Sequence, residues 1–183
     1  CCKVCLQYLV ILAKVLYQQT IFRALENDEP LPFTSSEMDS ALNAICEIGF
    51  DEPLILDKDL IVYPIPAGHI LDAASFLISW DGDLYFFTGD ICFENRGLLP
   101  SAPKIGAKKI RLLVRESTYI NQNKNRQDSV SCLCDSIDEA ISNGHQILIA
   151  SLSIDRAQDV LATIASHFSL TGNETPIYID GSR

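Results

Sequence analysis

A histidine and an aspartate bracket two apolar runs in the stretch 64-PIPAGHILDAASFLISWDGDLYFFTGD-90. His69 follows a glycine before the first run, and Asp90 follows a glycine after the second, so both side chains are expected at strand ends. Imidazole and carboxylate are ligands that hold Zn²⁺ or Mn²⁺ during hydrolysis, and a carboxylate can bridge two ions. Taken singly, a lone histidine is more often structural, and an aspartate after glycine often closes a turn. Together they indicate part of a metal site.

The other candidate ligands do not complete such a site. The chain has three histidines, and we interpret His145, before a predicted strand, and His167, in the last turn of a predicted helix, as structural. Cys2 and Cys5 have the spacing of a zinc knuckle, but no second pair matches it, and the 132–134 pair of cysteines is one residue too close. A catalytic zinc needs three protein ligands and two ions need more, so a chain with three histidines cannot complete a histidine-rich two-metal site.

Glu116 stands at the end of another predicted strand, 109-KIRLLVRES-117. A structural interpretation pairs it with Arg115 or a neighbouring lysine. A functional interpretation makes it a carboxylate that orients a metal-bound histidine without touching the metal.

The elements that position these residues follow from two periodicities. Apolar residues at helical spacing predict a helix over 3–26, and Ser35 or Ser36 is expected to cap a second helix that runs to about Ile48 and is ended by Gly49. Alternating β-rich runs separated by turns predict strands at 53–57, 60–65, 74–79 and 84–89, the last two as a hairpin. Beyond residue 126, helices and strands alternate over 127–142, 146–150, 155–168 and 176–180, which predicts right-handed βαβ crossovers and a parallel sheet. We therefore expect an α/β fold with a domain boundary near residue 120.

The net charge and the cysteine content limit which functions and compartments are expected. The net charge of −10 argues against a general nucleic-acid binder. Half of the 14 basic residues nevertheless fall between Lys104 and Arg126, with only Glu116 against them, so this strip is either a solvated face or an anion-facing surface. Seven scattered cysteines favour a reducing, cytosolic or nuclear compartment, here taken as cytoplasmic. The apolar run at 4–17 is too short to span a bilayer, so no membrane partner is expected.

Four ordered segments, AGHILDAASFLI, DLYFFTGD, RLLVRESTY and GHQILIASLSIDRAQDVL, resemble the β-CASP branch of the metallo-β-lactamase superfamily, whose metal-dependent nucleases include the endonuclease of pre-mRNA 3′-end cleavage and ribonuclease J. The resemblance implies that residues 1–120 are the C-terminal portion of a first metallo-β-lactamase segment, part of an αββα sandwich. Residues 121–183 would then begin the parallel α/β β-CASP domain. It also implies that His69 binds a metal, that Asp90 bridges two metals, and that Glu116, as the catalytic-motif carboxylate, lies beside them.

The same resemblance implies that the parent protein is a two-metal nuclease that hydrolyses RNA and uses zinc. Manganese is the alternative metal, and single-stranded DNA is the alternative substrate. The chain begins with Cys1 rather than Met, which indicates a piece of a longer protein. The family's HxHxDH signature is expected upstream and its closing histidine motifs downstream, so we expect this chain to be inactive alone. Asp72, Ile120 and Asp155 stand where the family has glycine, so the alternative is a degenerate, non-catalytic scaffold or partner subunit in RNA processing. An exposed sheet edge could also pair two copies into a homodimer.

Overall fold

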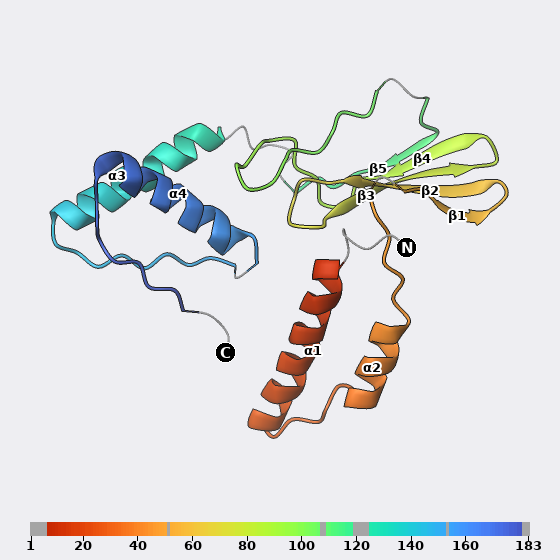
Figure 1. The fold of residues 1–183 in the computed structure, drawn as a ribbon, viewed down its shortest axis with the longest axis horizontal. Coiled ribbons are helices and arrows are strands. Elements are labelled where there is room, and N and C mark those ends of the chain that lie inside the picture. Colours follow the sequence, from red (N-terminus) through yellow and green to blue (C-terminus); the bar gives the residue numbers. More distant parts are fainter. Residues whose placement is uncertain (1–6, 51, 107–108, 119–124, 153, 181–183) are drawn as a thin grey trace. The chain divides into compact units, whose positions relative to one another are not determined.

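Two compact units make up the fold of this chain in the computed structural model, which describes residues 7–50, 52–106, 109–118, 125–152 and 154–180. The first unit comprises residues 1–95 and 101–116, and the second comprises 96–100 and 117–183. Figure 1 shows the elements of both. The domain boundary expected near residue 120 falls within 119–124, outside the described residues, so its assignment stays a prediction.

Two helices open the first unit, α1 (Gln7–Glu26) and α2 (Ser35–Asn43). The cap of α2 is Thr34 rather than either predicted serine, because Glu37 completes a capping box with it. The Glu37 amide donates to Thr34 Oγ1 at 3.2 Å, and the Thr34 amide donates to Glu37 Oε2 at 2.7 Å. The Thr34 hydroxyl also donates to Glu37 Oε2 at 2.8 Å, and the hydrogen bonds that the carboxylate accepts from the Thr34 amide and hydroxyl lower the pKa of Glu37. The helix also ends earlier than predicted, since the Ala44 amide closes the last turn on carbonyls of Ala41 and Leu42.

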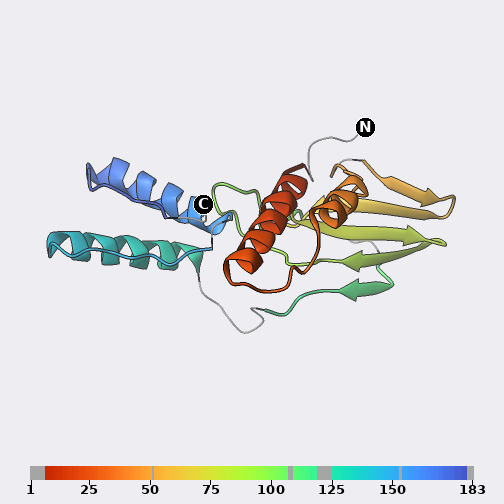
Figure 2. The same cartoon turned by 90° about the horizontal axis from the view of Figure 1, so that it is seen from below.

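The first unit contains a five-stranded sheet in the order β1 to β5. Its strands are β1 (Leu54–Asp57), β2 (Leu60–Pro66), β3 (Ala74–Trp80), β4 (Asp83–Phe87) and β5 (Leu112–Val114). The first four form the predicted antiparallel meander, and β5 adds to β4 in parallel (Figure 2). Asp81 and Gly82 form the two-residue β3–β4 turn with φ of 49° and 81°, as residues with positive φ do in tight hairpins. The predicted hairpin is therefore confirmed.

One face of this sheet holds its best-buried side chains. Leu77 pairs with Phe86 across β3 and β4, and Ser75 lies two residues earlier on the same face, because side chains alternate along a strand. These three side chains are 4%, 6% and 0% exposed, respectively. The opposite face carries the more exposed Trp80, whose ring lies 6.1 Å from that of Tyr85. The buried face thus ends, at Ser75, directly beneath the loops that carry the candidate ligands.

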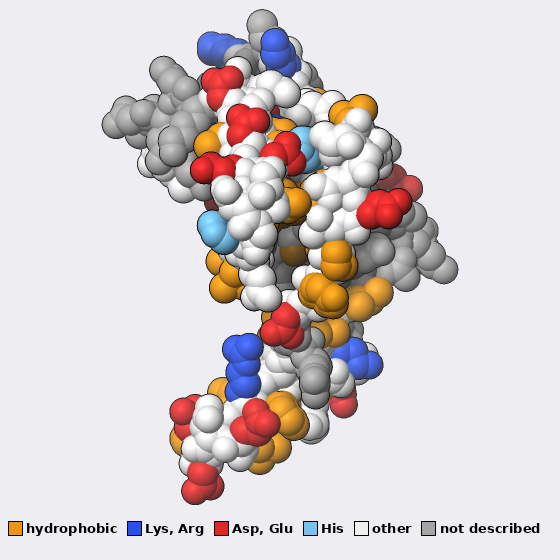
Figure 3. All heavy atoms as spheres, turned by 90° about the vertical axis from the view of Figure 1, so that its left-hand side faces the viewer, with side chains coloured by type: hydrophobic (Ala, Val, Ile, Leu, Met, Phe, Trp, Pro, Cys, Tyr) orange, Lys and Arg blue, Asp and Glu red, His pale blue; other side chains and the backbone are white. Residues whose placement is uncertain are grey.

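The second unit is built on α3 (Arg126–Ser142) and α4 (Arg156–Thr171). Ile137 and Ile164 are buried, and His167 on α4 lies 2.9 Å from the Asp138 carboxylate on α3. Cys134 is also buried, and burial, followed by the charge of Asp138, raises the pKa of its thiol. Acidic side chains are interspersed with apolar ones over the surface that α3 and α4 present in Figure 3. None of the helices in the described ranges is long and apolar enough to cross a membrane.

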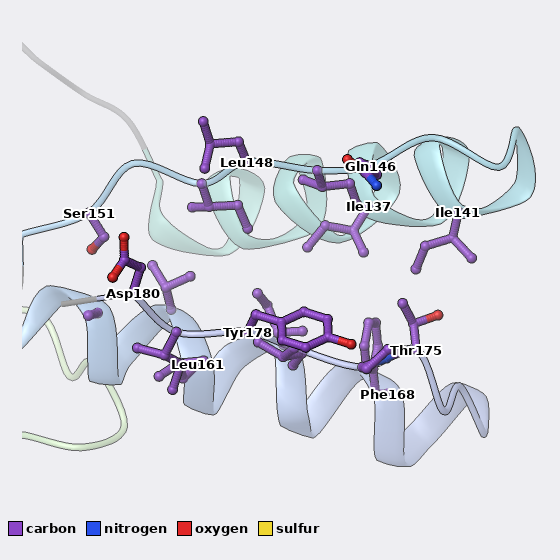
Figure 4. A pocket seen from close by; sticks show the side chains of 18 of the residues that line it. Ile137, Ile141, Gln146, Leu148, Ser151, Leu161, Phe168, Thr175, Tyr178 and Asp180 are labelled. Carbon is purple, nitrogen blue, oxygen red and sulfur yellow. The ribbon is translucent and has the colours of Figure 1, made fainter.

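The two strands predicted in the second unit are wrong as strands. Residues 146–150 and 176–180 are extended, but they carry no strand pairing within the described part of the chain. Instead they line a groove of about 670 Å³ together with α3 and α4, as the labelled Leu148 and Tyr178 show (Figure 4). Two strands alone are marginal in water because a stable sheet needs three or more, and Leu148 and Tyr178 are 97% and 89% exposed. The mixed α/β class is confirmed, whereas the metallo-β-lactamase sandwich and the parallel β-CASP sheet stay predictions.

Candidate metal site

His69 lies in a compact loop that joins β2 to β3. The Ala67 amide donates to the Ala73 carbonyl at 2.7 Å, and the Ala73 amide donates to the Ile70 carbonyl at 3.0 Å. Gly68 and Asp72 both have positive φ, 68° and 62°, a conformation that favours glycine and tolerates aspartate. His69 lies between these two residues, and its side chain is 27% exposed.

Asp90 lies in the loop that follows β4. Gly89 has a φ of 54°, so the chain turns there directly after the buried Thr88. The Asp90 carboxylate is 69% exposed, and its Oδ2 lies 3.7 Å from His69 Nε2. The structure therefore brings together the two residues predicted as metal ligands, at the same end of β3 and β4.

Glu116, the third predicted site residue, follows β5. Its Oε1 accepts a hydrogen bond from the Ile91 amide at 3.0 Å, so it holds the loop at the residue after Asp90. This contact supplies a role for Glu116 that the sequence reasoning did not foresee. Its predicted role in orienting a metal-bound histidine stays a prediction.

Further hydrogen bonds tie the two ligand loops together. The Cys92 amide donates to the Ala67 carbonyl at 2.8 Å, which joins the Asp90 loop directly to the His69 loop. The Ser75 hydroxyl donates to the Thr88 carbonyl at 2.7 Å. The sequence reasoning missed Ser75, because nothing in the pattern of β3 distinguishes it from Ser79 on the same strand.

The donor set fits part of a metal centre. A separation of 3.7 Å between His69 Nε2 and Asp90 Oδ2 is longer than a hydrogen bond, but it suits two donors that each bind one ion at about 2.0–2.2 Å. Nitrogen and oxygen donors of these kinds are those that zinc prefers. The described residues contain no cluster of three or more histidine, cysteine, aspartate or glutamate side chains that could hold a metal. Cys2 and Cys5 lie outside the described residues, and Cys132 and Cys134 are free thiols on α3.

The basic strip between Lys104 and Arg126 is partly neutralised. Arg111 Nη1 lies 2.8 Å from Asp83 Oδ2 in the first unit, and Arg126 Nη2 lies 2.8 Å from Asp159 Oδ1 in the second. Lys104 and Lys109 are exposed, whereas Lys108 and Lys124 of the same strip lie outside the described residues. Ion pairing thus favours the solvated-face interpretation for two of the arginines, and the exposed lysines keep the anion-facing interpretation open.

A buried ion pair fixes the start of α4, where the predicted segment Arg156-Ala157-Gln158 opens the helix. Asp155 has a φ of 64° and makes no capping hydrogen bond. Its Oδ2 instead lies 3.3 Å from Arg96 Nη2, and the two side chains are 8% and 6% exposed. Asp155 therefore keeps the positive φ typical of glycine and adds a buried charge partner.

Comparison with known proteins yields relatives over much of this chain. It is 32% identical over 154 residues to the endoribonuclease ysh1 of Emericella nidulans, covering 82% of this chain and 17% of that protein. It is 37% identical over 121 residues to an RNase J-like protein of Methanocaldococcus jannaschii, covering 63% and 28%. It is 30% identical over 167 residues to the transcription termination factor FttA of Methanothermobacter thermautotrophicus, covering 86% and 26%.

The chain belongs to the β-CASP family. Its matches to these relatives confirm the resemblance that His69, Asp90, Glu116 and the 155–160 segment first indicated. No protein-family model matches it. This β-CASP chain spans only between 17% and 28% of the lengths of the three relatives named above.

Proposed function

We propose that this chain is part of a metal-dependent phosphodiesterase that cleaves RNA. The observation that carries the proposal is the approach of His69 Nε2 to Asp90 Oδ2, 3.7 Å apart, in a chain whose relatives include an endoribonuclease and an RNase J-like protein. Zinc, or manganese in its place, would supply a Lewis acid for the phosphoryl group when bound. His69 and Asp90 would hold the ion, and Asp90 would bridge to a second one.

The rest of the chain would hold the side chains of His69 and Asp90 at a fixed distance from each other. The Cys92 amide bound to the Ala67 carbonyl, and the Ile91 amide bound to Glu116, support a fixed distance between the two ligand loops. Two donors are fewer than a catalytic zinc requires. The remaining ligands would come from sequence outside residues 1–183, in a metallo-β-lactamase sandwich completed by that sequence, so the 183 residues alone would not hydrolyse RNA.

RNA is the proposed substrate, with single-stranded DNA as the competing possibility. The names of the relatives support RNA, and the exposed Lys104 and Lys109 offer charges suited to phosphate. We assign the protein to the cytoplasm because four of its seven cysteines, those within the described residues, are free thiols: Cys46, Cys92, Cys132 and Cys134. Pairing of two copies through a sheet edge remains part of the proposal as a testable homodimer.

A second candidate function is a non-catalytic subunit. It is favoured by Asp72, which brings a carboxylate into the His69 loop where the family has glycine. The positive φ of 62° at Asp72 shows that the loop keeps the backbone that glycine would adopt. The added charge, rather than a changed fold, is therefore what separates the two candidates.

The test is cleavage of labelled RNA by a protein that contains this chain and matches its relatives in length. We expect cleavage with Zn²⁺ or Mn²⁺ that chelation abolishes and that His69→Ala and Asp90→Ala each reduce by roughly 1,000-fold or more. Glu94→Ala, which removes another exposed carboxylate from the same loop, is the matched control and should retain activity. Full activity in Asp90→Ala would overturn the role of that residue, and no cleavage under any metal would favour the non-catalytic subunit.

A further inference from the structure

The β3–β4 ladder stops at the point where the Asp90 loop begins. The last paired residues are Phe76 and Phe87, so Ser75 and Thr88 stand one step beyond the final rung. The Thr88 amide turns away to donate to the Val114 carbonyl of β5 at 3.0 Å. The Thr88 carbonyl therefore accepts no backbone hydrogen bond from β3 within the β3–β4 ladder.

Ser75 supplies that missing partner with its side chain. Its hydroxyl donates to the Thr88 carbonyl oxygen at 2.7 Å, and the residue is 0% exposed. Thr88 is itself only 5% exposed, so water cannot readily replace the hydroxyl. Gly89, the next residue, turns with a φ of 54°, and a Cβ there would make ordinary van der Waals contact with the Ala74 carbonyl at 3.5 Å.

Two side chains thus form hydrogen bonds to the backbone on either side of Asp90. Ser75 holds Thr88, two residues before it, and Glu116 holds Ile91, directly after it. Removing the Ser75 hydroxyl would leave a buried carbonyl unsatisfied, and the turn would move to find another donor. Any such movement changes the distance between His69 Nε2 and Asp90 Oδ2.

We propose that Ser75 is a positioning residue, whose buried hydroxyl fixes the Thr88–Asp90 turn so that the Asp90 carboxylate stays at metal-bridging distance from His69. The inference rests on the proposed metal-binding function and deepens it, because it assigns to a residue remote from the metal the task of setting the donor geometry. The Ser75 hydroxyl binds the Thr88 backbone, so its effect would pass through the loop backbone.

The experiment uses the 183-residue chain and Mn²⁺ alone, with paramagnetic broadening of histidine ring signals measured by NMR. Two donors suffice for weak, selective broadening of His69, and the exposed His145 is the internal reference. We expect the Mn²⁺ concentration that halves the His69 signal to rise roughly 10-fold in Ser75→Ala. Ser75→Cys, which keeps the size and a weak donor, should lie between. Ser79→Ala, on the same face of the same strand, should match the unchanged chain.

The outcomes separate the two ideas. Suppose that Asp90→Asn removes the selective broadening of the His69 signal, but Ser75→Ala leaves its Mn²⁺ midpoint unchanged. That result would overturn the positioning role of Ser75 and support the metal site. Absence of selective broadening in the unchanged chain would overturn the metal site and the inference together. A merely structural serine would lower the urea midpoint of unfolding without moving the Mn²⁺ midpoint. If Ser75→Ala does not fold, Ser75→Cys decides the matter in the same assay.

Discussion

Replacement of Asp155 by glycine, the family's usual residue, should destabilise the second unit. The change relieves a strained backbone, with φ of 64° and ψ of −46° outside the left-handed helical region, which costs a non-glycine residue about 1–3 kcal/mol. It also breaks the ion pair with Arg96, in which both side chains are less than a tenth exposed, and breaking a buried pair costs about 3–5 kcal/mol. The cost of losing the ion pair exceeds the gain from relieving the backbone strain. Asp155→Gly should therefore lower the free energy of unfolding by about 2 kcal/mol.

Urea unfolding followed by far-ultraviolet circular dichroism measures this loss. Asp155→Asn separates charge from backbone, because asparagine also tolerates positive φ, and it should lose stability as well. Asp81→Gly is the matched control: it relieves a φ of 49° at an exposed turn and should be neutral or mildly stabilising. An Asp155→Gly protein as stable as the unchanged chain would refute the reasoning, since relief of the strain would then fully offset loss of the buried pair.

Two further predictions follow from shifted pKa values. The lowered pKa of Glu37 means that the capping box stabilises α2 above the ordinary glutamate pKa, and that this contribution is lost as pH falls through the lowered value. Acid titration of helicity should show this loss, and Thr34→Ala, which should cost about 1 kcal/mol, should remove the pH dependence. The raised pKa of Cys134 keeps its thiol protonated, so mass spectrometry after limited alkylation should find it modified more slowly than the exposed Cys46 and Cys132. Equal rates at all three thiols would contradict the burial of Cys134.

The sheet of the first unit could be predicted because its information is local. Alternating apolar runs separated by aspartate-rich turns fix both strand positions and antiparallel pairing, and the Asp81-Gly82 turn fixes the β3–β4 register. The two extended segments of the second unit show the limit of such patterns. Residues 146–150 and 176–180 have strand composition, but composition does not supply a pairing partner, and the described chain gives them a groove instead of a sheet.

The candidate site divides in the same way. His69 and Asp90 could be predicted from residue type and from strand-end position, strengthened by the family resemblance, and the structure places them together. The contacts of Ser75 with Thr88 and of Glu116 with Ile91 depend on where the β3–β4 ladder stops and on the parallel addition of β5. Neither feature is encoded in a local pattern, so the sequence named Glu116 without its partner and passed over Ser75.

The central claim, that His69 and Asp90 share a catalytic metal, is tested most directly by zinc-edge anomalous diffraction. The measurement requires crystals of a protein that contains this chain and matches its relatives in length. The account predicts an anomalous peak about 2.0–2.2 Å from both His69 Nε2 and Asp90 Oδ2. The claim would be contradicted if zinc bound at full occupancy elsewhere in the protein. His69 Nε2 and Asp90 Oδ2, 3.7 Å apart, would then show no anomalous peak between them.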